Sequence, residues 1–243
     1  MARLTPTIER LGDDVVNFYL VHHPDGLTLI DAGLPGHLPQ VQALLPDVRA
    51  VLLTHGHPDH TGLAAAAHRA GADVWIHEAD APILADGPRS ALRHAKPERS
   101  AVPYLLRRPA ALATVLHMAR RGAFGADPVP AVRTFAGDQR LDDVPGRPRV
   151  VTLPGHTPGT VAYHFPDLGA LFTGDALVTL DGLTGHVGPG LVCRGFTHDG
   201  AAALASLDRL TDLPAALILP GHGEPLDASP QHAADQARRA GLR

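Results

Sequence analysis

Residues 54–62 read THGHPDHTG and place four side chains of metal-binding type within six positions, namely His55, His57, Asp59 and His60. Imidazole and carboxylate groups together suit zinc and similar divalent ions. The proline and the two glycines of this stretch favour a tight turn with room for an ion. The chain has 16 His, so a chance cluster of histidines is an alternative to a metal site. The rest of the sequence distinguishes between the two.

Three further motifs each present one more side chain of the same kind. They are PGHTPGT with His156, FTGDA with Asp175, and PGHGEP with His222. Each follows a short apolar run and is bracketed by Gly or Pro, which alone indicates only a turn. In this order after the first cluster, they favour a single metal centre.

The elements that carry these motifs are predicted from the apolar pattern. Residues 48–53 and 73–77 read as strands, residues 15–21 and 27–30 as a hairpin, and the apolar runs before the three single-ligand motifs as further strands. Helices are expected at 37–45, 63–70, 199–210 and 230–240. The ligand side chains therefore follow strand ends, where loops can bring them together.

The order T-H-x-H-x-D-H, P-G-H-T-x-G, T-G-D and P-G-H-G resembles the metallo-β-lactamase superfamily of hydrolases over roughly residues 15–225, most closely its glyoxalase II-like branch. The resemblance implies an α/β fold: a four-layer αβ/βα sandwich with two mixed β-sheets flanked by helices. It also implies a site for two divalent metal ions, most simply zinc, with iron and manganese as alternatives.

Carried over by motif, the resemblance assigns the first ion to His55, His57 and His156, and the second to Asp59, His60 and His222. Asp175 would bridge the two ions together with a water or hydroxide. Asp31, in LIDAG, matches an acidic residue that supports a ligand histidine from behind. A turn-forming Asp is the alternative for that position.

Two bound ions would generate a bridging hydroxide at neutral pH and polarise the carbonyl that it attacks. The catalytic carboxylates are then Asp59 and Asp175, whose negative charge keeps the ions close. The proton donor to the leaving group is either Asp59 or a metal-bound water.

The function predicted first is hydrolysis of a thioester or ester of a small molecule. Only 21 residues follow His222, so the glutathione-binding C-terminal domain of glyoxalase II is not expected. A lactone hydrolase is one alternative, although no Tyr follows Asp175 closely. A mononuclear iron persulfide dioxygenase, using the equivalents of His55, His156 and Asp175, is the other. Class B β-lactamases commonly have Cys at the Asp175 position, which argues against that activity.

Composition limits the partners. The formal net charge is −4 and no apolar run approaches the length of a membrane span, so neither nucleic acid nor a membrane is expected as a partner. Cys193 is the single cysteine and the first residues lack a signal-peptide pattern, so we expect a cytoplasmic enzyme. The oligomeric state is open, and a dimer is compatible with it.

Residues 1–243 are predicted to form one domain, with a helical insertion or cap at about 80–130. This stretch is rich in Ala, Arg and Pro, and Pro109 is well placed to begin a helix with Leu112, Val115, Leu116 and Ala119 on one face. Either it is an insertion with a solvated charged face, or it covers the metal site and selects an anionic or apolar acyl substrate.

Overall fold

The computed structural model describes residues 2–243. Its larger sheet is mixed, with antiparallel pairing from β1 to β4 and parallel pairing from β4 to β7. The strands follow the chain order: β1 (Ala2–Arg3), β2 (Ile8–Gly12), β3 (Asn17–His23), β4 (Gly26–Ile30), β5 (Val48–Leu52), β6 (Asp73–His77) and β7 (Arg133–Phe135).

The second sheet is also mixed, because β10 and β13 run parallel while the other pairs are antiparallel. Its spatial order is β14 (Leu226–Asp227), β13 (Leu217–Pro220), β10 (Ala170–Gly174), β9 (Val161–Phe165) and β8 (Arg149–Thr152). A separate two-stranded hairpin consists of β11 (Val178–Asp181) and β12 (His186–Gly190).

Side-chain alternation along the strands produces the layers. In β3, Phe18 and Leu20 pack into a core beneath the helices of the N-terminal half, whereas Tyr19 packs between the two sheets. The inter-sheet core also takes Tyr163 and Phe172 from the second sheet. The larger sheet is thus covered on both faces, by helices on one and by the second sheet on the other, as a sandwich requires.

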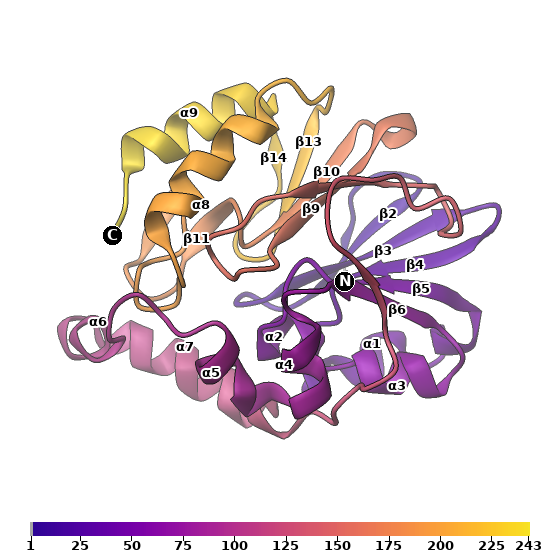
Figure 1. Cartoon of the computed structure of the whole chain (residues 1–243), viewed down its shortest axis with the longest axis horizontal. Helices are drawn as coiled ribbons and strands as arrows, with labels where there is room; N and C mark the ends of the chain where they lie inside the picture. Colours follow the sequence, from indigo (N-terminus) through magenta and orange to yellow (C-terminus); the bar gives the residue numbers. More distant parts are fainter. Residues whose placement is uncertain (1) are drawn as a thin grey trace.

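The outer layers are helical (Figure 1). On the larger sheet lie α1 (Leu38–Val41) and α3 (Ala64–Arg69), and on the second sheet lie α8 (Gly200–Ser206) and α9 (Pro230–Ala240). The predicted α/β fold, a four-layer sandwich of two mixed sheets flanked by helices, is confirmed. Within residues 2–243, none of the helices combines the length and apolar character needed to cross a lipid bilayer.

Two helices are shorter than predicted. The α-helix expected at 199–210 ends at Ser206 and continues as a 3-10 turn over Leu207–Leu210. The helix expected at 37–45 is limited to α1, and the residues after it form a short 3-10 turn that begins at Leu45. After α1 the chain tightens, because the Leu44 N–H donates to the Val41 carbonyl, an i→i+3 bond in place of the i→i+4 bond that would continue the α-helix.

Between β6 and β7 the chain forms α4 (Ala81–Asp86), α5 (Ala91–His94), α6 (Val102–Arg107) and α7 (Pro109–Arg120). The helix expected from Pro109 is present, and the apolar face identified in its sequence is not the side that is buried. Leu112 is 48% exposed and Leu116 is 43% exposed, whereas Ala111 is fully buried. The buried side is set by what α7 contacts: Leu183 near one end and Val16 and Leu34 near the other.

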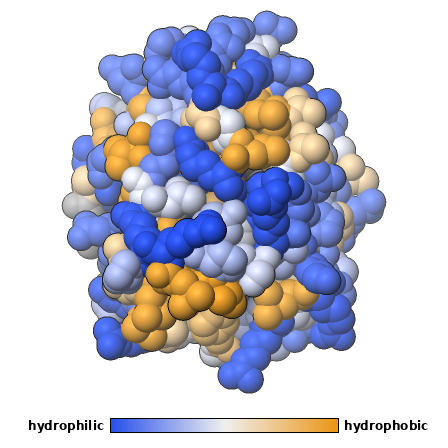
Figure 2. Space-filling view, turned by 90° about the vertical axis from the view of Figure 1, so that its left-hand side faces the viewer, coloured by the Kyte–Doolittle hydropathy of each residue, from blue (hydrophilic) through white to orange (hydrophobic). Residues whose placement is uncertain are grey.

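The exposed side of these helices carries an unusual amount of apolar surface. The large hydrophobic side chains that are exposed there are Leu92, Val102, Leu106, Leu112 and Leu116. Figure 2 shows hydrophobic surface in the lower part of this face of the molecule, beside strongly hydrophilic side chains. The helix pair α6–α7 therefore presents a mixed apolar and basic outer surface.

Candidate metal centre

The predicted ligand side chains lie in loops that follow strand ends at one edge of the sandwich, except Asp59 and His60, which belong to the one-turn helix α2 (Pro58–Thr61) after the first of these loops. His55 follows β5 and Asp31 follows the parallel strand β4. Asp175 follows β10 and His222 follows the parallel strand β13. Because neighbouring parallel strands end at the same edge of a sheet, these loops meet there.

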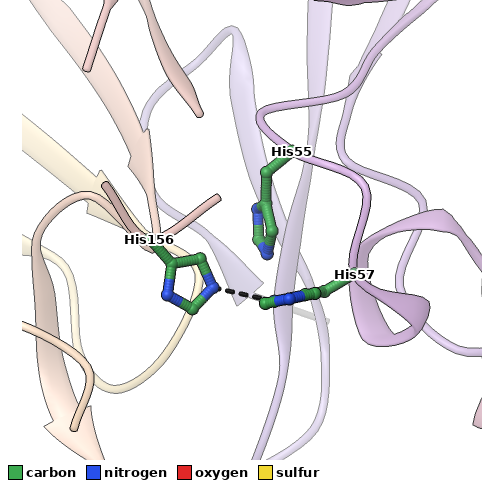
Figure 3. A group of neighbouring side chains, drawn as sticks. All are labelled: His55, His57 and His156. Atoms are coloured by element: carbon green, nitrogen blue, oxygen red, sulfur yellow. Dashed lines mark hydrogen bonds between the residues drawn. The ribbon is translucent and has the colours of Figure 1, made fainter. Parts of the chain in front are cut away.

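Three histidines from two distant loops converge on one point (Figure 3). The ring nitrogens of His55, His57 and His156 lie within 4.8 Å of one another. His57 Nδ1 and His156 Nε2 are 2.9 Å apart, although the residues are 99 positions apart in sequence. A second group of the same compactness consists of Asp59, His60 and His222.

Asp175 lies between the two groups. Its carboxylate oxygens are 3.3 Å from His156 Nε2 and 4.0 Å from His55 Nε2. They are also 3.4 Å from His60 Nε2 and 3.2 Å from His222 Nε2. One carboxylate thus faces members of both groups, which is the placement that a bridging ligand needs.

The protonation of the histidines differs between the two groups. Burial holds the pKa of His55 and His156 well below its usual value of 6.5, because a buried imidazolium is poorly solvated. Burial acts in the same direction on His60 and His222, but nearby carboxylates, Asp175 first, raise the pKa to about 9 and about 10. The first group therefore offers neutral nitrogen ligands, and the carboxylates around His60 and His222 favour positive charge there, which a bound cation would supply.

Asp31 is buried behind the histidines. Asp31 Oδ2 lies 2.8 Å from His60 Nδ1, and Asp31 Oδ1 accepts a hydrogen bond of 2.7 Å from the Thr54 N–H. The Thr54 hydroxyl donates to the same carboxylate and lies 3.1 Å from His55 Nδ1. Asp31 contacts one predicted ligand directly and a second through Thr54, as an orienting residue would.

His222 is held by backbone. Its Nδ1 donates to the Val15 carbonyl at 2.6 Å, across 207 positions of sequence. The Asp13 carboxylate accepts from the N–H groups of Val15 and Val16, and also contacts His37 Nε2 at 2.9 Å and His117 Nε2 at 2.7 Å. Asp13 thereby links helix α7 to the loop that orients His222.

Whether these residues suit metal ions can be tested from buried polar atoms that lack a partner. Within residues 2–243, such atoms include His55 Nε2, His60 Nε2 and Asp175 Oδ1, which belong to three residues whose ligand atoms lie within 4.8 Å of one another. Buried nitrogen and oxygen atoms are costly when unpaired, and three of them in one cluster fit a site for divalent cations. The donor set of imidazole and carboxylate fits the same ions.

The structure brings together all seven predicted ligands and Asp31. Sequence reasoning missed Thr54, the Val15 carbonyl and Asp80, whose carboxylate accepts hydrogen bonds from the Gly56 and Gly159 N–H groups. The carbonyl has no side-chain signal, and Asp80 stands at the first position of a predicted helical stretch, where Asp is common as a cap. Cys193 is buried in a different cluster, with Ala111 and Leu183, and burial raises the pKa of its thiol to about 12.

With this geometry, the chain belongs to the metallo-beta-lactamase superfamily, whose sequence profile matches residues 11–222. A hydroxyacylglutathione hydrolase from Synechococcus sp. (strain JA-3-3Ab) is 28% identical over 201 residues, which cover 82% of this chain and 59% of that protein. The chain thus spans less than two thirds of that enzyme.

Two solved structures support the same family. A metallo-beta-lactamase family protein from Thermus thermophilus, TTHA1429, has a TM-score of 0.67 and 26% identity, covering 96% of this chain and 79% of that one. The protein TTHA1623, solved in a di-iron-bound form, has a TM-score of 0.59 and 28% identity, covering 90% of this chain and 93% of that one.

Proposed function

We propose that this protein is a dinuclear metal-dependent hydrolase that cleaves a thioester or ester bond of a small molecule in the cytoplasm. The observation that carries this proposal is the position of Asp175, within 4.0 Å of histidines from both groups. The name of the hydroxyacylglutathione hydrolase relative supports the choice of a thioester.

In this proposal His55, His57 and His156 hold one ion, and Asp59, His60 and His222 hold the second. Asp175 is shared between them, and Asp31 orients His60. Zinc is the ion we expect, because it accepts mixed imidazole and carboxylate ligands without a strong geometric preference. Iron and manganese are the alternatives.

The bound ions would supply an activated water and polarise the carbonyl oxygen of the substrate. The chain's own residues then handle charge and protons. Asp175 and Asp59 place two carboxylates beside the ions, and Asp59 is partly exposed, at the edge of the cluster. That location suits Asp59 as the group that passes a proton to the leaving group. No Ser or Cys nucleophile is required.

Metal content tests the reaction class. Protein purified without added metal should contain close to two divalent ions per chain, mostly zinc. An active protein with a single iron would replace the hydrolase by the alternative, a mononuclear persulfide dioxygenase. A protein that carries no metal and gains no activity with added zinc would refute both.

A substrate panel tests the bond. Thioesters, simple esters, lactones, β-lactams and phosphoesters should be compared at equal concentration, with Asp175→Ala protein purified in parallel to correct for contaminating hydrolases. We expect the largest kcat/KM for a thioester or ester. Preference for a lactone would support the other hydrolase alternative instead.

We further propose one domain over residues 1–243 in which the helical segment at about 80–130 caps the site. Helix α7 packs against Leu183 of the β11–β12 hairpin turn on one side and against Val15 and Leu34 on the other. Both the hairpin and Val15 contact His222. The first residues of the segment, however, are part of the site's support, since Ile83 and Asp80 pack against Gly56. The cap is therefore assigned to α6–α7.

A further inference from the structure

Asp80 is a buried residue whose carboxylate accepts hydrogen bonds from loops outside its own helix. It follows β6 at the start of α4, where an Asp commonly accepts a hydrogen bond from the first turn of its helix, yet it makes no such bond. Asp80 Oδ2 accepts from the Gly56 N–H at 2.8 Å and from the Thr157 hydroxyl at 2.6 Å. Asp80 Oδ1 accepts from the Gly159 N–H at 2.8 Å.

These three donors belong to the two loops that carry the first histidine group. Gly56 lies between His55 and His57, and Thr157 directly follows His156. A single carboxylate therefore joins two loops that come from different sheets. Because the side chain is 0% exposed, its charge depends on these donors, and charge-assisted hydrogen bonds of this kind are stronger than neutral ones.

The motif glycines allow this contact. A Cβ atom at position 159 would lie 2.7 Å from Asp80 Oδ1, and one at position 56 would lie 2.8 Å from Ile83 Cδ1. Neither N–H could then approach the carboxylate at its present distance without displacement of Asp80 or Ile83. The glycines of H-G-H and T-P-G-T are thus explained by the need to pack against Asp80 and its helix.

We propose that Asp80 is a positioning residue that sets the separation of His55, His57 and His156 by holding their two loops together. It touches neither substrate nor reacting atoms. Residues that fix ligand orientation from behind commonly contribute 10–100-fold to metal affinity. This inference rests on the proposed metal centre but is independent of the substrate.

The proposal predicts selectivity between the two ion positions. The second group is supported by other residues, since Asp31 contacts His60 and the Val15 carbonyl contacts His222. Removal of the Asp80 carboxylate should weaken the position formed by His55, His57 and His156 and spare the other. A residue that only stabilised the fold would weaken both equally.

The test uses Asp80→Asn, which keeps the side-chain volume and replaces one acceptor oxygen by a donor. Zinc affinity is measured by chelator competition in two backgrounds, His222→Ala to isolate the first position and His57→Ala to isolate the second. We expect roughly a 10–100-fold loss at the first position and little change at the second. Thr157→Val, which removes one of the three bonds, should give a smaller loss at the same position.

Asp181→Asn is the matched control. Asp181 is also buried, and it accepts its hydrogen bonds within its own turn, from the Leu183 and Thr184 N–H groups and the Thr184 hydroxyl. It should leave the ratio of the two zinc affinities unchanged. Equal losses at both positions in Asp80→Asn, or no loss at either, would overturn the proposal. If Asp80→Asn does not fold, Thr157→Val decides by the same criteria.

Hydrogen exchange of the metal-free proteins provides a readout without bound metal. The Gly56 and Gly159 amides should lose protection in Asp80→Asn and keep it in Asp181→Asn. Retained protection of both amides would refute the positioning role. Wild-type protein without two metal ions would refute the proposed function, whereas normal wild-type metal content with an unselective variant would refute only the role of Asp80.

Discussion

Replacing Asp31 by Asn should selectively weaken the second metal position, opposite to the effect of Asp80→Asn. Asp31 has a φ of +59°, a left-handed conformation that Asn tolerates better than most residues. Asn is therefore a cleaner substitution than Ala, because it preserves the backbone while removing the negative charge.

The magnitude follows from the contacts of Asp31. Its carboxylate lies 2.8 Å from His60 Nδ1, which leaves His60 Nε2 directed at Asp175, 3.4 Å away. A hydrogen bond to a charged group contributes about 1.5–3 kcal/mol. That range corresponds to roughly a 10–100-fold loss of affinity for the ion held by Asp59, His60 and His222.

A smaller loss is expected at the first position. Asp31 reaches His55 only through the Thr54 hydroxyl, which is 3.1 Å from His55 Nδ1. In the variant this hydroxyl can still bond to the Asn side-chain oxygen. The orientation of His55 should therefore be largely kept.

The assay is zinc competition against a chelator at constant pH, again in the His222→Ala and His57→Ala backgrounds, with Asp181→Asn as the control. Unchanged affinity at both positions would show that packing alone orients His60, and the orienting role of Asp31 would be wrong. A loss of zinc affinity confined to the position of His55, His57 and His156 would also refute this role, because Asp31 contacts His60 directly.

Three further outcomes are expected. Asp175→Ala should remove the shared carboxylate, lower the metal content below two ions per chain and abolish turnover. Elemental analysis measures the metal content, and two tightly bound ions in this variant would disprove the proposed bridging role of Asp175. Replacing residues 102–120 by a Gly/Ser linker should leave both ions bound. It should reduce kcat/KM more for the true substrate than for a small activated ester, because a cap excludes water from the reaction. Loss of metal would instead place α6–α7 in the structural core. Asp13→Asn should lower the free energy of unfolding by about 2 kcal/mol at pH 7. Burial opposes ionisation of Asp13, but hydrogen bonds from His37 and from backbone N–H groups hold its pKa below the usual range, so this stability is present above about pH 4 and is lost as pH falls further. Urea unfolding at pH 7 and at acid pH should show that the difference in free energy of unfolding between wild-type protein and Asp13→Asn becomes smaller at acid pH. A difference that does not change with pH would refute the stabilising role of the Asp13 carboxylate.

The sequence was informative about the metal site because the ligand residues occur in short sequence motifs. His55, His57, Asp59 and His60 are close in space because they are close in sequence. The single-ligand motifs followed predicted strands, and parallel strands in one sheet end at one edge. Family membership and the fold class followed from the same motifs, whose order along the chain is specific.

Helix α7 marks a limit of that reasoning. Its sequence offers apolar residues on more than one side, and the pattern placed Leu112, Val115, Leu116 and Ala119 on one face. The structure buries Ala111 and leaves both leucines substantially exposed. Periodicity can identify an amphipathic helix, but the face that is buried depends on the elements it meets.

The sequence by itself therefore determined which side chains can bind metal and the strand ends that carry them. The tertiary structure alone decided which residues hold those side chains in place. Asp80 bonds to Thr157 across 77 positions and His222 bonds to the Val15 carbonyl across 207. Such partners are chosen by how the two sheets pack, and a carbonyl group is common to every residue. No local pattern distinguishes a carboxylate that caps its own helix from one that joins two ligand loops.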